Sequence, residues 1–229
     1  MLLLSLDTSS AAGSAAVVRD GRIVVERAGD GTRTHAERLP RDLMDVLDAA
    51  RCSLEEIDGF AVITGPGSFT GLRVGIATVQ GLAFARRRPV YPVTAFEAYR
   101  RHAGGAHATA VWIDAHRGEV FATLFDAGGG VLEPPSSRPP AHTLDAWQAA
   151  LEGLTRVHFS GDGAVRYRDT ILERVGEAAA VDEHVPLLAG VAGQIASRDP
   201  ARAVSPHAVV PQYVRRPDAE LARDRRKFD

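Results

Sequence analysis

The chain has 229 residues, a formal net charge of −2, 45% hydrophobic residues and a single cysteine. This length allows one large domain or two small ones, with a core that needs no disulfides. Lys227 is the only lysine and Cys52 the only cysteine. A phosphate-loop lysine, a Schiff-base lysine, an intrachain disulfide and a four-cysteine zinc site are therefore excluded in the body of the chain. The nearly balanced charge predicts no general attraction to nucleic acid or to an anionic membrane.

No segment approaches the roughly 20 apolar residues that a membrane-spanning helix needs. The apolar start, residues 1–6, has no basic residues and meets Asp7 at once. It is too short for a signal peptide and predicts a first buried strand. We therefore expect no membrane contact and a cytoplasmic location.

The first half of the chain predicts an α/β arrangement. Strands are expected at 2–6, 15–18, 22–27, 60–64 and 90–93, and helices at 36–50, 72–85 and from 95 to about 103. Asp20-Gly21 is a hairpin signal, and Thr34 with Glu37 forms a capping-box pattern. This order predicts a hairpin meander continued by parallel strands with crossover helices.

The second half begins in a similar way. Strands are expected at 110–113, 120–125 and 157–159, helices at 144–151, 165–175 and 191–197, and a loop at 128–140. Asp7 and Asp114 each end a strand before a turn and a returning strand, which indicates a duplicated half. We therefore expect a first lobe at 1–105, an abbreviated second lobe at 106–214 and a charged tail at 215–229.

The glycine-rich segment 65–71 follows a strand and opens a helix, an arrangement that can hold a phosphate. Leu72-Arg73 follows where a P-loop needs Lys-Ser/Thr, and the spacing does not fit the dinucleotide fingerprint. A tight turn that needs positive φ explains the same residues. The Asp7-Thr8-Ser9 turn also has two interpretations, a phosphate-facing hairpin or a self-stabilised turn. The candidate vestigial phosphate site comprises Asp7, Thr8, Ser9, Gly65, Gly67 and Ser68.

Other catalytic patterns are weak. His35 is followed four residues later by Leu39 rather than by a second histidine, and there is no HExxH motif, so zinc is not expected. No Gly-x-Ser-x-Gly elbow follows a strand, which disfavours a hydrolase.

The helix expected after Gly71 has polar residues only at Arg73, Thr78 and Gln80 before Ala85. It therefore has no broad solvent face and is either buried in its own core or covered by another chain. Glycine in a helix costs roughly 1 kcal/mol relative to alanine, so Gly75 and Gly81 should have packing reasons. With the helix from residue 36, it could form a two-helix docking surface.

Together these segments resemble the TsaB (YeaZ-like) family of tRNA threonylcarbamoyladenosine biosynthesis proteins. The resemblance rests on LSLDTS at 4–9, His35, TGPGSFTGLRVGIAT at 64–78, IDAHRGEVF at 113–121 and PQYVR at 211–215. Phe121 and Val214 stand where that family more often has Tyr and Leu. The resemblance implies an α/β actin/sugar-kinase-like (ASKHA) fold of two RNase-H-like lobes, with mixed sheets and flanking helices.

The resemblance also implies a subunit without catalytic residues, metal or cofactor. It would support a TsaD-like transferase that modifies the adenosine beside the anticodon, together with a TsaE-like ATPase. It would meet tRNA only through that complex, and could pair with itself as a homodimer when alone. In the catalytic paralogue two histidines bind the metal, and Leu39 stands in place of the second. A nucleotide is not expected on the isolated chain.

The partner interface is expected on the two helices, with some residues necessarily facing the core. The expected residues are Leu39, Leu43, Val46, Arg73, Ile76, Val79, Gln80 and Ala83. The alternative, from another class, is a nucleotide-dependent ATPase or kinase-like enzyme that uses Asp7 and the loop 65–71.

Overall fold

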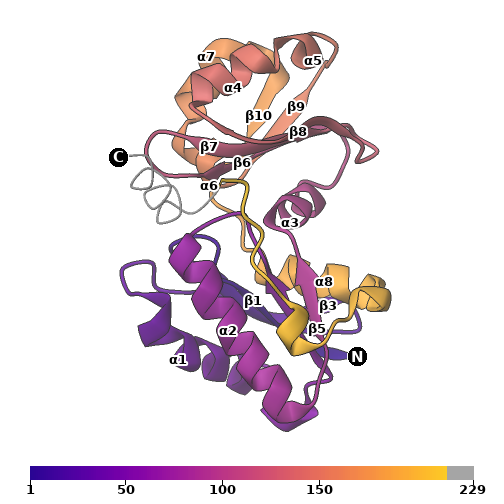
Figure 1. Ribbon diagram of the computed structural model, residues 1–229. Coiled ribbons are helices and arrows are strands. Elements are labelled where there is room, and N and C mark those ends of the chain that lie inside the picture. The colour runs from indigo at the N-terminus through magenta and orange to yellow at the C-terminus, as the bar shows by residue number, and fades with distance from the viewer. Residues whose placement is uncertain (216–229) are drawn as a thin grey trace, which may run out of the picture.

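The computed structural model describes residues 1–215 and contains two five-stranded sheets, one in each lobe of Figure 1. The expected charged tail, apart from Arg215, lies outside the described residues. The first sheet has the order β3-β2-β1-β4-β5 and the second β10-β9-β6-β7-β8. The strands of the first are β1 (Leu2–Asp7), β2 (Ser14–Arg19), β3 (Arg22–Ala28), β4 (Gly59–Ile63) and β5 (Val90–Val93). Those of the second are β6 (Ala108–Asp114), β7 (Val120–Phe125), β8 (Val131–Arg138), β9 (Val157–Ser160) and β10 (Ala179–Val181).

The two sheets repeat one topology. The central strand β1 pairs antiparallel with β2 and parallel with β4, and β6 pairs in the same way with β7 and β9. Asp7 and Asp114 are the last residues of the two central strands. The duplicated half is therefore confirmed, and the fold is the two-lobed actin/sugar-kinase-like arrangement.

Both faces of the first sheet are covered by helices. Successive residues of a strand point to opposite faces, so Leu2 and Leu4 pack with α1 (His35–Ala49) and α2 (Phe69–Arg86). Leu3 packs on the other side with α3 (Ala95–His102) and α8 (Ala189–Arg198). This two-sided burial explains why β1 is apolar almost throughout.

The second lobe has its own core and also shares one with the first. Trp112 lies 6.1 Å from Trp147 and 5.6 Å from Phe159 between ring centroids, beneath the helices of this lobe. The opposite face of β6 and β7 packs with α3 and α8 through Ile113 and Phe121. The helices of this lobe are α4 (Pro140–Ala146), α5 (Gln148–Glu152), α6 (Asp162–Arg166) and α7 (Arg168–Val175).

The expected loop at 128–140 is wrong, because β8 occupies most of it. Pro134 and Pro135 lack N–H groups, but they lie at an edge strand where the register with β7 shifts between Ala122 and Leu124. Edges and bulges are the places in a sheet where proline is tolerated.

The chain returns to the first lobe after the second is built. α8 packs on β1, β2 and β4, and Val204 bridges β5 at Val90 with N···O distances of 3.0 and 2.8 Å. Short 3₁₀ helices lie at Leu54–Glu56, Gly176–Ala178, Pro200–Arg202 and Pro206–Ala208. The expected division at residue 105 places α8 in the second lobe, although this helix packs on the first sheet. The division of the chain into domains stays a prediction. No helix within residues 1–215 has both the length and the apolar character to cross a membrane.

Two of the glycines in α2, Gly75 and Gly81, predict opposite effects of the same substitution. A Cβ at Gly75 would overlap the Thr8 Oγ1 atom, whereas a Cβ at Gly81 would meet no atom within 4 Å. We expect Gly75→Ala to lower the free energy of unfolding by about 1–3 kcal/mol. Gly81→Ala, the matched control, should raise it by up to about 1 kcal/mol. Urea unfolding followed by circular dichroism measures both, and an equal effect of the two substitutions would contradict the packing described here.

Candidate functional site

Most residues expected at a partner interface lie in the core of the first lobe. Six apolar side chains of α1 and α2 are at most 6% exposed and pack against the sheet: Leu39, Leu43, Val46, Ile76, Val79 and Ala83. The expectation that they form a seam with another chain is therefore corrected. Helical spacing identified the apolar face of each helix, and that face covers the sheet. Of the other two, Arg73 is exposed, and Gln80 is half-buried and donates to the Val209 carbonyl at 3.0 Å.

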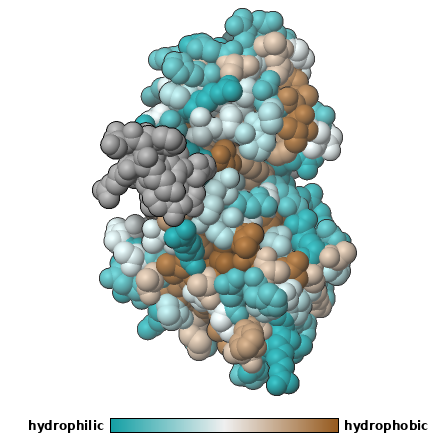
Figure 2. Space-filling view, viewed as in Figure 1, coloured by the Kyte–Doolittle hydropathy of each residue, from teal (hydrophilic) through white to brown (hydrophobic). Residues whose placement is uncertain are grey.

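The outward face of α2 carries mostly small residues, with a large apolar side chain near each end. Its exposed positions follow the helical repeat: Phe69, Thr70, Arg73, Ala77, Gly81, Phe84 and Ala85. Phe84 is 79% exposed, and Met44 on the neighbouring helix α1 is 54% exposed. Figure 2, drawn in the view of Figure 1, shows hydrophobic surface across the middle of the lower lobe, where α2 and the C-terminal segment lie. We call this outward face of α2 and α1 the two-helix face.

The structure brings the two halves of the candidate phosphate site together. The Ser68 N–H donates to the Ser9 carbonyl at 2.7 Å, and the Ser68 hydroxyl accepts the Gly71 N–H at 3.2 Å as the N-cap of α2. A Cβ at Gly67 would overlap Ser9. Gly65 has a φ of +114° and faces the Gln212 carbonyl instead. The Ser68 and Gly71 N–H groups are thus engaged by the protein itself, which supports the self-stabilised turn; a phosphate site stays a prediction.

A second helix N-terminus is also engaged by the chain itself. The Glu26 carboxylate accepts the Gly190 N–H of α8 at 2.7 Å, and the Ser14 hydroxyl accepts the Ala189 N–H at 3.0 Å. Burial raises the pKa of Glu26, while the bond from Gly190 opposes that shift. An internal carboxylate therefore holds the position where a helix N-terminus attracts an anion.

Three carboxylates gather where the lobes meet. Asp7 is buried and accepts the Ser9 N–H at 2.8 Å and the Ser9 hydroxyl at 2.6 Å; burial raises its pKa. Asp162 accepts the Asp114 N–H at 2.9 Å, and burial, with the charges of Asp114 and Asp7, raises the pKa of Asp162 to about 6. Asp114 itself pairs with Arg166 at 2.8 Å. Within residues 1–215 no three His, Cys, Asp or Glu side chains are placed to hold a metal ion.

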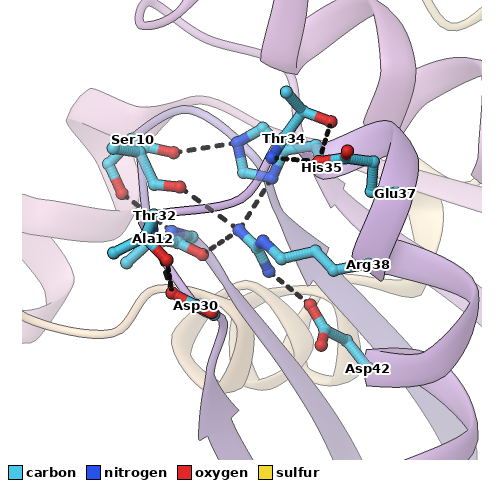
Figure 3. Close-up of polar contacts among 11 residues, drawn as sticks. Ser10, Ala12, Asp30, Thr32, Thr34, His35, Glu37, Arg38 and Asp42 are labelled. Carbon is cyan, nitrogen blue, oxygen red and sulfur yellow. Dashed lines mark hydrogen bonds and ion pairs between the residues drawn. The ribbon is translucent and has the colours of Figure 1, made fainter.

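His35 is held on both sides by protein atoms (Figure 3). Its Nε2 lies 3.0 Å from the Ser10 carbonyl, and its Nδ1 lies 2.8 Å from the Arg38 guanidinium. The carbonyl can only accept and the guanidinium can only donate, so the ring is neutral with its proton on Nε2. Both ring nitrogens are therefore engaged, and neither is offered to a metal.

Arg38 is the residue of this site that sequence reasoning missed. It is only 4% exposed, and its guanidinium also contacts the carbonyls of Ala11 and Ala12 and the Asp42 carboxylate. It thereby ties the β1–β2 turn to the first turns of α1. The Arg38–Asp42 spacing is that of a helical ion pair, and this was the only signal in the sequence.

The neutral state of His35 predicts a pH dependence. Burial, followed by the charge of Arg38, lowers the pKa of His35. The unfolded chain then binds the proton more tightly than the folded one, so the contribution of His35 to stability is complete above about pH 6.5 and is lost as the pH falls below it. Replacing His35→Gln keeps a donor and an acceptor without the titration. We expect the variant to lose less stability than the wild type between pH 7 and 5.

Urea unfolding at each pH measures this difference. His107→Gln, which changes an exposed histidine, is the matched control and should follow the wild type. A His35→Gln curve parallel to that of the wild type would contradict the neutral, doubly bonded ring.

Comparison with known proteins gives a consistent result. Residues 29–223 match the family model described as TsaD, tRNA N6-adenosine threonylcarbamoyltransferase. An uncharacterized protein of Mycobacterium leprae is 32% identical over 96% of this chain, which spans 56% of that protein's length. The tRNA threonylcarbamoyladenosine biosynthesis protein TsaB of Bacillus subtilis is 25% identical over 96% of both chains.

The structural comparison agrees with the sequence comparison. The solved structure of YeaZ from Pseudomonas aeruginosa superposes with a TM-score of 0.73 at 29% identity, covering 93% of this chain and 99% of that one. The matched family model covers most of the chain, and the structural match covers both lobes. The chain therefore belongs to the TsaD family, and within it is a TsaB/YeaZ-like protein.

Proposed function

We propose that this chain is a non-catalytic subunit in tRNA threonylcarbamoyladenosine biosynthesis that binds and supports a TsaD-like threonylcarbamoyltransferase. The similarity to the TsaB protein of Bacillus subtilis supports the pathway. A TsaE-like ATPase and the tRNA meet the chain only within that assembly, in the cytoplasm, and the chain pairs with itself when the partner is absent.

The state of the candidate groups supports the absence of catalysis by the chain alone. A general base or a metal ligand must present a free lone pair to its target, but both nitrogens of His35 are bonded to Ser10 and Arg38. The buried carboxylate of Asp7 accepts two bonds from Ser9 through Oδ1, which holds this carboxylate in the turn. Within the described residues no contact favours the alternative of a nucleotide-dependent enzyme that uses Asp7 and the loop 65–71.

Gly81 is the observation that carries the docking proposal. A glycine inside a helix costs about 1 kcal/mol relative to alanine, and a Cβ at Gly81 would meet no atom of the chain within 4 Å. Nothing within residues 1–215 therefore accounts for this glycine. A helix packed closely against the two-helix face would account for it, because the distance between helix axes is set by the side chains at the contact. Exposed Met44 and Phe84 supply apolar area for the same contact.

A charged side chain at Gly81 should block this docking without disturbing the fold. We expect Gly81→Glu to abolish co-purification with a TsaD-like protein. Gly153→Glu is the matched control, because a Cβ at Gly153 also meets no atom within 4 Å and the residue is exposed on the second lobe. Thermal unfolding shows whether both variants are folded. Binding of Gly81→Glu at the wild-type level would remove the two-helix face from the proposal.

Reconstitution tests the function itself. Threonylcarbamoyladenosine formation on unmodified tRNA should require this chain together with its TsaD-like and TsaE-like partners, and this chain alone should give none. ATP turnover by the isolated chain that disappears in Asp7→Ala would contradict a non-catalytic subunit and favour the nucleotide-dependent enzyme.

A further inference from the structure

The C-terminal segment 203–215, here called the strap, runs from the first lobe to the second (Figure 1). We propose that Arg215, through its bond to the second lobe, holds Tyr213 against α2 and thereby positions the N-terminal end of the two-helix face for the TsaD-like partner. The partner in this inference rests on the proposed function. Arg215 is thus a positioning residue for docking, and Tyr213 is the residue through which it acts.

The strap follows α2 from its C-terminal end to its N-terminal end. Its second residue, Val204, bridges β5. The Gln80 side chain of α2 then donates to the Val209 carbonyl at 3.0 Å. The Gln212 N–H donates to the Thr64 carbonyl at 2.7 Å, directly before the glycine-rich loop. These contacts set the course of the strap along α2 and deliver Tyr213 to the first turn of that helix.

Tyr213 completes an exposed cluster on this first turn. Its ring lies 5.3 Å from the Phe69 ring between centroids, and its hydroxyl accepts a hydrogen bond from the Arg73 Nε at 3.2 Å. The Arg73 guanidinium carbon lies 3.8 Å from the Phe69 ring centroid. Phe69 and Tyr213 remain 37% and 38% exposed, so the cluster is ordered by mutual contact and still faces outward.

An ordered, outward-facing cluster of two aromatic rings and an arginine suits a protein contact. Tyrosine and arginine are enriched among the residues that dominate binding energy at interfaces. Fixing their rotamers before association also lowers the entropy lost on binding. Arg73 was expected at the interface from the sequence; Tyr213 extends that expectation to a residue 140 positions away in the chain.

Arg215 attaches the strap to the second lobe through three contacts. It donates to the Glu119 carboxylate at 2.7 Å and to the Ala115 carbonyl at 3.1 Å, and its guanidinium carbon lies 5.9 Å from the Phe121 ring centroid. Glu119 is itself held by the Ser137 hydroxyl at 2.7 Å. Because Tyr213 lies only two residues before Arg215, loss of this anchor frees the strap end that carries the tyrosine ring.

Affinity for the TsaD-like partner tests whether Arg215 acts through Tyr213. We expect Arg215→Ala and Tyr213→Ala each to lower the affinity about tenfold. The double variant should bind with the same affinity as the single variant that binds less tightly. Arg174→Ala is the matched control, because Arg174 also pairs with a surface carboxylate, that of Asp145, but lies away from the strap. Losses that multiply in the double variant would overturn the positioning role, and so would wild-type affinity of Arg215→Ala.

Hydrogen exchange of the isolated chain tests the same inference without a partner. Arg215→Ala and Glu119→Gln should both increase amide exchange in residues 209–215 and 69–73, and leave β6 unchanged. Unchanged exchange in both segments would overturn the inference. Failure of the wild-type chain to bind a TsaD-like protein would instead contradict the proposed function. The hydrogen-exchange result does not depend on any partner, so the two failures can be told apart.

Discussion

The contact on which the rest of the structure depends is the close approach of the Thr8–Ser9 turn to α2. It is possible only because residues 67, 71 and 75 are glycines, where any Cβ would overlap Ser9 or Thr8. The turn thus lies directly against the glycine-lined side of the helix, and the Ser68 N–H of the loop bonds to the Ser9 carbonyl of the turn. The chain's own backbone thus takes one of the N–H groups of a loop whose sequence resembles a phosphate cradle. The same contact fixes the rotation of α2 about its axis, and that rotation leaves Gly81 and Phe84 facing outward.

The electrostatics of the site follow from this close packing. The β1–β2 turn presents carbonyl groups to the first turns of α1, and a buried cation, Arg38, satisfies those of Ala11 and Ala12. Arg38 in turn requires a neutral His35, because a protonated ring would place two donors against each other. The arginine therefore takes the role of a fixed internal cation beside the only histidine of α1's first turn. Because Arg38 is buried and its guanidinium is bonded to protein groups, it stabilises the β1–β2 turn and is not available to bind a substrate.

The sequence predicted the succession of strands and helices in the first lobe, the duplicated lobes and the family, because these depend on local signals. The apolar run of β1, the glycine-rich loop and the repeated strand–Asp–turn unit are all contiguous in the chain. It could not assign the interface, because helical spacing shows that Leu39 and Val79 share an apolar face but not what covers that face. Arg38 was missed because its partners come from a turn more than 25 residues earlier. β8 was missed because two prolines disfavour a strand everywhere except at an edge or bulge.

The shared core between the lobes gives a physical reason why the proposed non-catalytic subunit keeps both of them. Ile113 and Phe121 of the second sheet pack in one cluster with Phe96 and Leu188, which belong to helix α3 and the segment before α8. Opening the lobes about a hinge would expose this apolar surface, and each large side chain exposed costs about 1.5–3 kcal/mol. Enzymes that close around a substrate need such a motion, whereas a binding surface gains from its absence. In the positioning role proposed for Arg215, the second lobe is a rigid support for the strap. Residues of the second lobe then help to set the shape of the two-helix face without being part of it.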